Sequence, residues 1–284
     1  MSFKDILVAL DTARPARGRV ELAAALAERF DAHLIGLYPT LPAEAPGRRG
    51  YFDYFDRSLI DPLYREYQQK IAADGDAAQR LFEEIASRRG LSAEWRTAAG
   101  YPSEITALHG RYADLIVLGQ PDPEDTQAML TRPLPQEVVL AVGRPILVVP
   151  YAGTWEEIGR HVLVGWDSSR EATRAINDAM PLLAGAEAVT VLAVDPAGGL
   201  AGHGEVPGAD IALHLARHGV EATIESTVSA GIGAGNTLLS RASDLGADLL
   251  VMGAYGHSRV RELLLGGATR TVLESMTLPV LMAH

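Results

Sequence analysis

Four glycines near the end of the chain have the spacing of a phosphate site. Gly253 and Gly256 are three residues apart, and Gly266 and Gly267 follow in the stretch GAYGHSRVRELLLGG, just before a predicted helix. Bare backbone at a helix start presents free N–H groups to an anion, because no side chain holds the anion away. The pattern therefore predicts a phosphate-binding loop. The alternative is a glycine-rich turn with no ligand.

Other residues of this stretch could add to such a site. Arg259 and Arg261 would supply positive charge, whereas Ser258 and Thr269 offer hydroxyl groups. The pattern itself assigns only the glycines. We include Ala268 and Thr269 in the predicted site, because they begin the helix whose N–H groups would face the anion.

The elements that position the glycines occur twice in the chain. DILVALD ends at Asp11 and HVLVGWD ends at Asp167, an offset of 156 residues. ADLIVLG ends at Gly119 and ADLLVMG ends at Gly253, an offset of 134, and RPILVVP and LPVLMAH keep that second offset. The chain thus contains one unit twice, and the first copy carries 22 additional residues in its middle.

Each copy is predicted to alternate strands and helices. Apolar runs such as HLIGLY and AVTVLAV are typical of buried strands, and VELAAALAERF and EATRAINDAMPLLA have helical spacing. Strands that are apolar along their whole length indicate parallel sheets covered on both faces. We expect two α/β domains, 1–152 and 159–284, each with roughly five strands and joined near YAGTWEEIGR.

This order of elements resembles the universal stress protein family in its tandem, two-domain form. The family's loop, G-x2-G-x9-G-(S/T), matches Gly253, Gly256 and Gly266, but Gly267 stands where Ser or Thr is usual. The resemblance implies a doubly wound parallel sheet of order 3-2-1-4-5 in each domain. It also implies a regulatory protein of the stress response that binds ATP or another adenine nucleotide, with or without Mg²⁺, at the C-terminal ends of the strands.

The resemblance also implies the residues on the other side of the site. Asp167 would contact the adenine or the ribose. Further positions that would line the nucleoside pocket are Gly165, Trp166, Val194 and Met252. From the residues alone, Asp167 and Ser168 are also good N-caps for the helix that follows. Both roles stay open for Asp167, and capping is favoured for Ser168.

The first copy lacks the loop. Asp122, Arg132 and Pro133 stand at the positions of the last three glycines, within or after an acidic PDPED segment that would repel phosphate. Pro133 has no N–H to donate. The first copy is therefore predicted not to bind a triphosphate, and its Asp11 to cap a helix. In the second copy, the missing hydroxyl at position 267 costs about 1 kcal/mol of binding, which lets a diphosphate or monophosphate compete.

Composition limits the other function classes. The chain of 284 residues has no cysteine, 48% hydrophobic residues and a net charge of −11, so disulfides and thiolate chemistry are excluded and broad nucleic-acid binding is disfavoured. Neither a signal peptide nor an apolar run long enough for a membrane span is found, so we expect a cytoplasmic protein without a membrane partner.

For three other features of the sequence, a structural role is favoured over a functional one. GIGAG at 231–235 is expected to be a turn, since a dinucleotide fingerprint needs a different spacing. His214 and His218, with His203 upstream, lack the further ligands of a metal site, so none is predicted. The aromatic cluster within 51–67 of the insertion is expected to pack on its own domain, with a partner interface as the alternative.

No catalytic constellation stands out, so a binding protein is favoured over an enzyme. The alternatives are a nucleotide-free scaffold and a slow ATP hydrolase or phosphotransferase, with weak ATPase activity or autophosphorylation as the most that is expected. The resemblance further implies pairing through the last strands, either between the two copies or in a homodimer.

Overall fold

The computed structural model describes residues 2–11, 16–40, 57–125, 132–196, 208–256 and 267–284, and for 57–68 the backbone alone. The elements of the first half are β1 (Asp5–Ala9), α1 (Ala16–Phe30), β2 (His33–Thr40), α2 (Arg57–Arg88), β3 (Ala93–Ala99), α3 (Pro102–Gly110), β4 (Leu115–Gly119), α4 (Pro135–Val142) and β5 (Ile146–Val149). Those of the second half are β6 (His161–Gly165), α5 (Arg170–Leu183), β7 (Ala188–Val194), α6 (Ala209–Arg217), β8 (Ala222–Thr227), α7 (Ala234–Asp244), β9 (Leu249–Gly253), α9 (Ala268–Ser275) and β10 (Val280–Ala283). The predicted strands and helices therefore lie where the apolar patterns placed them.

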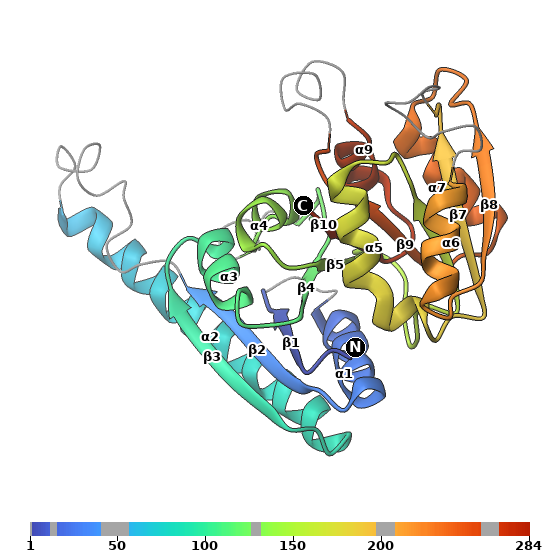
Figure 1. The fold of residues 1–284 in the computed structure, drawn as a ribbon. Helices are drawn as coiled ribbons and strands as arrows, with labels where there is room; N and C mark the ends of the chain where they lie inside the picture. The colour runs from blue at the N-terminus through green and yellow to red at the C-terminus, as the bar shows by residue number, and fades with distance from the viewer. Residues whose placement is uncertain (1, 12–15, 41–56, 126–131, 197–207, 257–266) are drawn as a thin grey trace.

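The two halves share one ten-stranded sheet. Its order is β3-β2-β1-β4-β5-β10-β9-β6-β7-β8, so each half has the predicted order 3-2-1-4-5 and is parallel throughout. The halves join where β5 and β10 pair in antiparallel fashion, with Leu147 opposite Leu281. In Figure 1 the blue-to-green half and the yellow-to-red half lie side by side along this seam.

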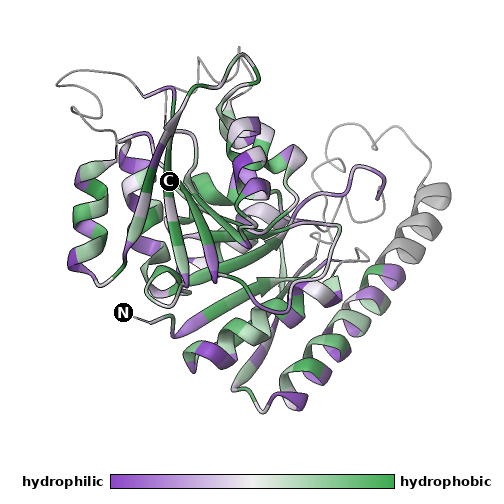
Figure 2. Ribbon diagram, turned by 90° about the vertical axis from the view of Figure 1, so that its right-hand side faces the viewer, coloured by the Kyte–Doolittle hydropathy of each residue, from purple (hydrophilic) through white to green (hydrophobic). Residues whose placement is uncertain are grey.

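Buried apolar residues on both faces of the sheet hold this arrangement together. The strands are mostly hydrophobic in Figure 2, whereas the helices alternate between hydrophobic and hydrophilic residues. Val8 and Val164 belong to the core on one face, and Leu7 and Leu163 to the core on the other. Neighbouring residues of one strand point to opposite faces, so each strand must be apolar along its whole length. This requirement explains the continuous apolar runs in the sequence.

The insertion of the first half contributes to the long helix α2. The C-terminal part of α2 buries Phe82 and Ile85 against the sheet, where Phe82 contacts Trp95 of β3. The predicted packing of the aromatic cluster within 51–67 falls on residues whose side chains lie outside the described part of the chain. In the described residues, no helix is both long and apolar enough to cross a membrane.

The strand order also fixes where a ligand could enter. In the second half β6 pairs with β7 on one side and with β9 on the other. The chain leaves β6 and β9 toward opposite faces of the sheet, and this opens a crevice at their C-terminal ends. Gly165 ends β6 and Gly253 ends β9, so the two segments singled out by the sequence meet at this crevice.

Candidate functional site

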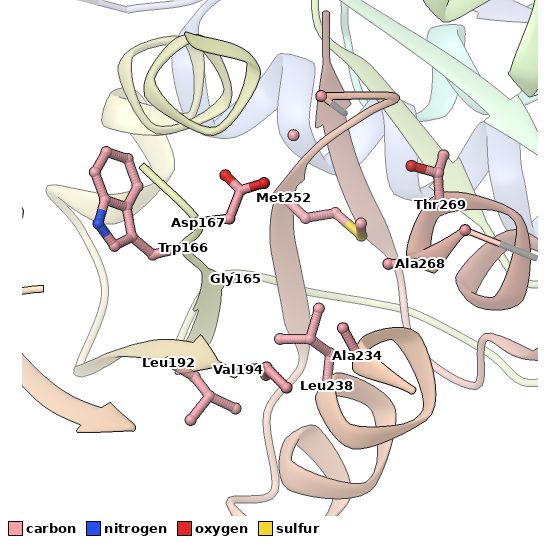
Figure 3. Close-up of a pocket in the computed structure, with 13 residues that line it drawn as sticks. Gly165, Trp166, Asp167, Leu192, Val194, Ala234, Leu238, Met252, Ala268 and Thr269 are labelled. Atoms are coloured by element: carbon pink, nitrogen blue, oxygen red, sulfur yellow. The ribbon is translucent and has the colours of Figure 1, made fainter. Parts of the chain in front are cut away.

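A pocket of about 320 Å³ lies at the C-terminal ends of β6, β7 and β9. Figure 3 shows Trp166 and Asp167 on one side, Ala268 and Thr269 on another, and a group of apolar side chains on a third. The residues that line it are Gly165, Trp166, Asp167, Leu192, Val194, Ala234, Leu238, Met252, Gly253, Gly256, Gly267, Ala268 and Thr269. Every residue of the predicted site is among them except Gly266, which lies outside the described residues.

One end of the pocket is apolar. Leu192 and Val194 come from β7, Met252 from β9 and Leu238 from α7. Gly165 leaves room there, because a Cβ at this position would lie 3.2 Å from both terminal carbons of Leu238. A flat, weakly polar group such as a heterocyclic base fits a wall of this kind.

Three residues that line the pocket were not predicted from the sequence: Leu192, Ala234 and Leu238. Leu192 lies two residues before Val194 on β7, so the alternation of a strand could have indicated it. Ala234 and Leu238 belong to α7, which begins within GIGAG, so that only the first three residues of that segment, 231–233, precede the helix. That turn has the predicted character, since Gly231 and Gly233 have positive φ angles and Gly233 is the N-cap of α7. Which face of α7 meets the pocket depends on tertiary packing alone.

The opposite end of the pocket is made of backbone. Gly267 is the N-cap of α9, and Ala268 and Thr269 form its first turn, whose N–H groups carry the partial positive charge of a helix start. The Thr269 hydroxyl accepts a hydrogen bond of 3.1 Å from Tyr255 N and is buried, so it fixes the beginning of the loop. Ser258, Arg259 and Arg261, which were considered for this site, lie outside the described residues.

Gly253 and Gly256, at this end of the pocket, are glycines for different physical reasons. A Cβ on Gly253 would lie 2.5 Å from Ala172 N, so Gly253 is required by the close packing of β9 on α5, whatever binds nearby. A Cβ on Gly256 would lie 3.1 Å from Ser169 Oγ and 3.2 Å from Glu171 Oε2. These contacts are tight, but small shifts of Ser169 and Glu171 would relieve them. Packing alone therefore excludes a side chain less strictly at Gly256 than at Gly253.

The polar rim next to Asp167 differs in part from the prediction. The cap of α5 is Ser169, whose Oγ accepts a hydrogen bond of 3.1 Å from Ala172 N. The capping role favoured for Ser168 is therefore wrong; Ser168 adopts a left-handed turn with φ of 60° instead. Asp167 Oδ1 accepts hydrogen bonds from the backbone N and the Oγ of Ser169, at 3.0 and 2.6 Å. Asp167 thus supports the cap and still lines the pocket.

Glu171 is a buried carboxylate that the sequence did not single out. It lies in the first turn of α5 with its carboxylate against Gly256, and Arg170 Nε donates a 2.6 Å hydrogen bond to it. Burial acts to raise the pKa of Glu171. The hydrogen bonds from Arg170 and from its own backbone N–H, together with the charges of Arg170 and His284, outweigh burial, so the pKa is held below its ordinary value. The phosphate end of the pocket therefore borders on a fixed negative charge.

The corresponding place in the first half is filled by its own side chains. Arg19 of α1 makes a two-pronged ion pair with Asp11, at 2.9 and 3.1 Å, and both residues are almost completely buried. A Cβ on Gly119 would lie 2.0 Å from Arg19 Nη1, so the guanidinium occupies the space beyond β4. Among the described residues, Asp11, Arg19 and Asp122 line a cavity of about 10 Å³.

Both carboxylate oxygens of Asp11 accept hydrogen bonds from Arg19, and the capping role expected for Asp11 stays a prediction, because residues 12–15 lie outside the described part of the chain. Ala175 stands at the position of Arg19 in the second copy, 156 residues later. An arginine in place of alanine on an apolar helix face was therefore the available signal.

Metal ligands do not cluster in the described part of the chain. His214 of α6 and its C-cap His218 have ring centroids 4.7 Å apart, but no group of three or more His, Asp or Glu residues that could hold a metal occurs among the described residues. His203 lies outside that part of the chain.

Comparisons with known proteins agree with this architecture. The sequence profile of the universal stress protein family matches residues 159–284. A universal stress protein from Synechocystis is 53% identical over 38 residues, a segment that spans only 13% of either chain. The crystal structure of a universal stress protein from Archaeoglobus fulgidus is similar with a TM-score of 0.72 and 15% identity, over 98% of this chain and 95% of that one.

A putative universal stress protein from Pseudomonas aeruginosa is similar with a TM-score of 0.59 and 20% identity, over 99% of this chain and 93% of that one. At such identities the structural likeness establishes the two-part fold alone, whereas the profile match establishes descent for the second half. Residues 159–284 thus match the universal stress protein family, and the fold of the whole chain is similar to the two-part structures of that family.

Proposed function

We propose that this chain is a regulatory protein of the stress response that binds one adenine nucleotide in the pocket of its second half. The observation that carries the proposal is the contrast between the two ends of that pocket. Leu192, Val194 and Leu238 offer an apolar wall to a base, and the first turn of α9 offers bare N–H groups to phosphate. Asp167 lies between the ends and could accept hydrogen bonds from ribose hydroxyl groups.

The first half supports the assignment as an internal control. The same fold is present there, but in the described residues Arg19 and Asp11 occupy the space at the ends of β1 and β4, beside a cavity of about 10 Å³. We therefore propose a stoichiometry of one nucleotide per chain. Adenine, as opposed to another base, follows from the family resemblance, and Mg²⁺ would be brought by the nucleotide.

The test is to identify what the purified protein carries and what it binds. Heat denaturation should release an adenine nucleotide that mass spectrometry identifies. Alternatively, isothermal titration with ATP, ADP, AMP and GTP should show saturable binding to one site with a preference for adenine. Absence of co-purified nucleotide together with absence of binding at millimolar concentration would leave only the scaffold alternative. Turnover of bound ATP would favour the hydrolase alternative.

We also propose that residues 1–152 and 159–284 act as two domains that pair with each other. β5 and β10 lie next to one another in the interior of the sheet, so neither offers a free edge to a second chain. A monomer in sedimentation analysis would support this pairing, and a dimer that is lost on changing residues of β5 or β10 would contradict it.

A further inference from the structure

Helix α9 is held at its two ends by different halves of the chain. Its first turn lines the pocket, through Ala268 and Thr269. Its last turn meets Gln120, which follows β4 of the first half: Gln120 Nε2 donates to Leu273 O at 2.9 Å and to Glu274 O at 3.3 Å. Figure 1 shows α9 on the side of the second half that is nearer to the first.

These hydrogen bonds pair carbonyl groups that have no hydrogen-bond partner within helix α9 itself. The last carbonyl groups of an α-helix have no N–H partner within it. α9 ends at Ser275, and Met276 continues in an extended conformation, so Leu273 and Glu274 belong to that last turn. The side chain of Gln120 therefore serves as a C-cap supplied from 153 and 154 residues away.

The amide of Gln120 is itself fixed by the first half. Only 5% of the residue is exposed. Its backbone N donates to Val149 O at 2.8 Å, and its Oε1 accepts a 3.3 Å hydrogen bond from Tyr151 N. With the oxygen committed to Tyr151, the NH₂ group faces α9. The contact is thus a directed hydrogen bond from a rigid part of one half to a helix of the other.

The second contact that positions α9 comes from its own half. A Cβ on Gly235, in the first turn of α7, would lie 2.8 Å from Thr271 Cβ and 2.9 Å from Ala268 O, so α7 and α9 pack at backbone distance. α9 has eight residues, and a helix of that length is not stable without packing. Its position must therefore be set by contacts of this kind, at one end by Gly235 and at the other by Gln120.

We propose that Gln120 is a positioning residue for the phosphate end of the pocket, through which the first half of the chain tunes nucleotide affinity. This inference rests on the proposed function. The N–H groups of the first turn move with the helix, and Glu274 O lies about 9 Å along the helix axis from Ala268. Loss of the cap lets the helix end fray and shift, and the phosphate contacts weaken. The apolar wall for the base comes from β7, β9 and α7 rather than from α9, so it changes less than the phosphate end.

Two substitutions separate the hydrogen bond from the volume of the side chain. Gln120→Met keeps a long side chain in the buried site but removes both the donor to α9 and the acceptor for Tyr151 N, whereas glutamate retains an acceptor for Tyr151 N. Gln120→Glu keeps the shape but places carboxylate oxygens against carbonyl oxygens at a helix end that already carries partial negative charge. The matched control is Gln79→Leu, because the Gln79 amide donates only to Glu83 within α2 of the first half.

The readout is the dissociation constant of ATP, AMP and adenosine, measured by titration for each variant. Gln120→Met should weaken ATP and AMP binding roughly fivefold, the value of one neutral hydrogen bond, and Gln120→Glu should weaken it more. Adenosine, which has no phosphate, should bind within about twofold of the wild type in both variants. Gln79→Leu should change none of the three.

Hydrogen exchange of the free protein provides a second readout that does not need nucleotide. The amides of α9 should exchange faster in Gln120→Met, while those of α5 stay as in the wild type. Unchanged ATP affinity in both Gln120 variants, equal losses for ATP and adenosine, or unchanged exchange in α9 would each overturn the inference. If the wild type binds no nucleotide, both the proposed function and this inference fail. If the wild type binds nucleotide and the Gln120 variants bind it equally well, only this inference fails.

Discussion

Replacing Gly256 by aspartate converts the second half toward the first, where Asp122 stands at the same position. The new carboxylate would enter a space that Ser169 Oγ and Glu171 Oε2 already border, at 3.1 and 3.2 Å from the new Cβ. It would therefore turn toward the open pocket, since Glu171 repels it. At about 6 Å from a phosphate and an effective dielectric constant near 20, two like charges cost about 3 kcal/mol. We expect ATP affinity to fall on the order of a hundredfold.

The assay is isothermal titration with ATP at two ionic strengths, with two controls. Gly256→Ala adds the Cβ without the charge and should weaken binding by no more than about threefold, because the neighbours need move only a little. Gly18→Asp adds the same charge in the first half, at a position where a Cβ meets nothing within 4 Å. The reasoning is refuted if Gly256→Asp binds ATP like the wild type, or if Gly256→Ala loses as much as Gly256→Asp.

Three further predictions concern the surroundings of the two sites. Arg19→Ala removes the guanidinium from the buried Asp11 carboxylate and should lower the free energy of unfolding by about 3–5 kcal/mol in urea titration. The double variant with Asp11→Ala should recover part of that loss, and a single variant as stable as the wild type would contradict this prediction. Glu171 has a folded-state pKa below the ordinary 4.5, so its contribution to stability is present above that pH and is lost as the pH falls through the folded value. The stability difference between wild type and Glu171→Gln should therefore be largest at neutral pH and shrink on acidification, and a constant difference would count against it. Gly165→Ala crowds Leu238 at the base end and should weaken ATP and adenosine by the same factor; a loss confined to ATP would show that the base does not bind there.

The sequence could predict the fold because the information was local and repeated. Each strand is an apolar run and each helix has its own period, and the offsets of 156 and 134 residues give two copies of one strand order. The positions of Gly165, Asp167 and Gly253 at strand ends follow from the same pattern. The antiparallel pairing of β5 with β10 depends on which sheet edges meet. The sequence predicts pairing through the last strands but does not distinguish pairing within one chain from pairing between two chains.

The parts of the site that could not be predicted depend on tertiary packing. Leu238 reaches the pocket only because α7 packs beside α9, and Gln120 reaches α9 from the other half of the chain. Whether Ser168 or Ser169 caps α5 depends on a shift of one residue in the turn, and the sequence pattern does not distinguish the two. Gly253 shows the converse, since a glycine that matches a binding motif is also required by packing against α5.

The central claim is that a nucleotide phosphate binds at the first turn of α9 and nowhere in the first half. The most direct test is to titrate isotope-labelled protein with ATP and follow the backbone amide resonances. The account predicts saturable shifts for Gly267, Ala268 and Thr269, with one ATP per chain and no comparable shifts for Gly119 or Asp122. Saturable shifts at Gly119 and Asp122 with none at α9, or no shifts at millimolar ATP, would contradict it.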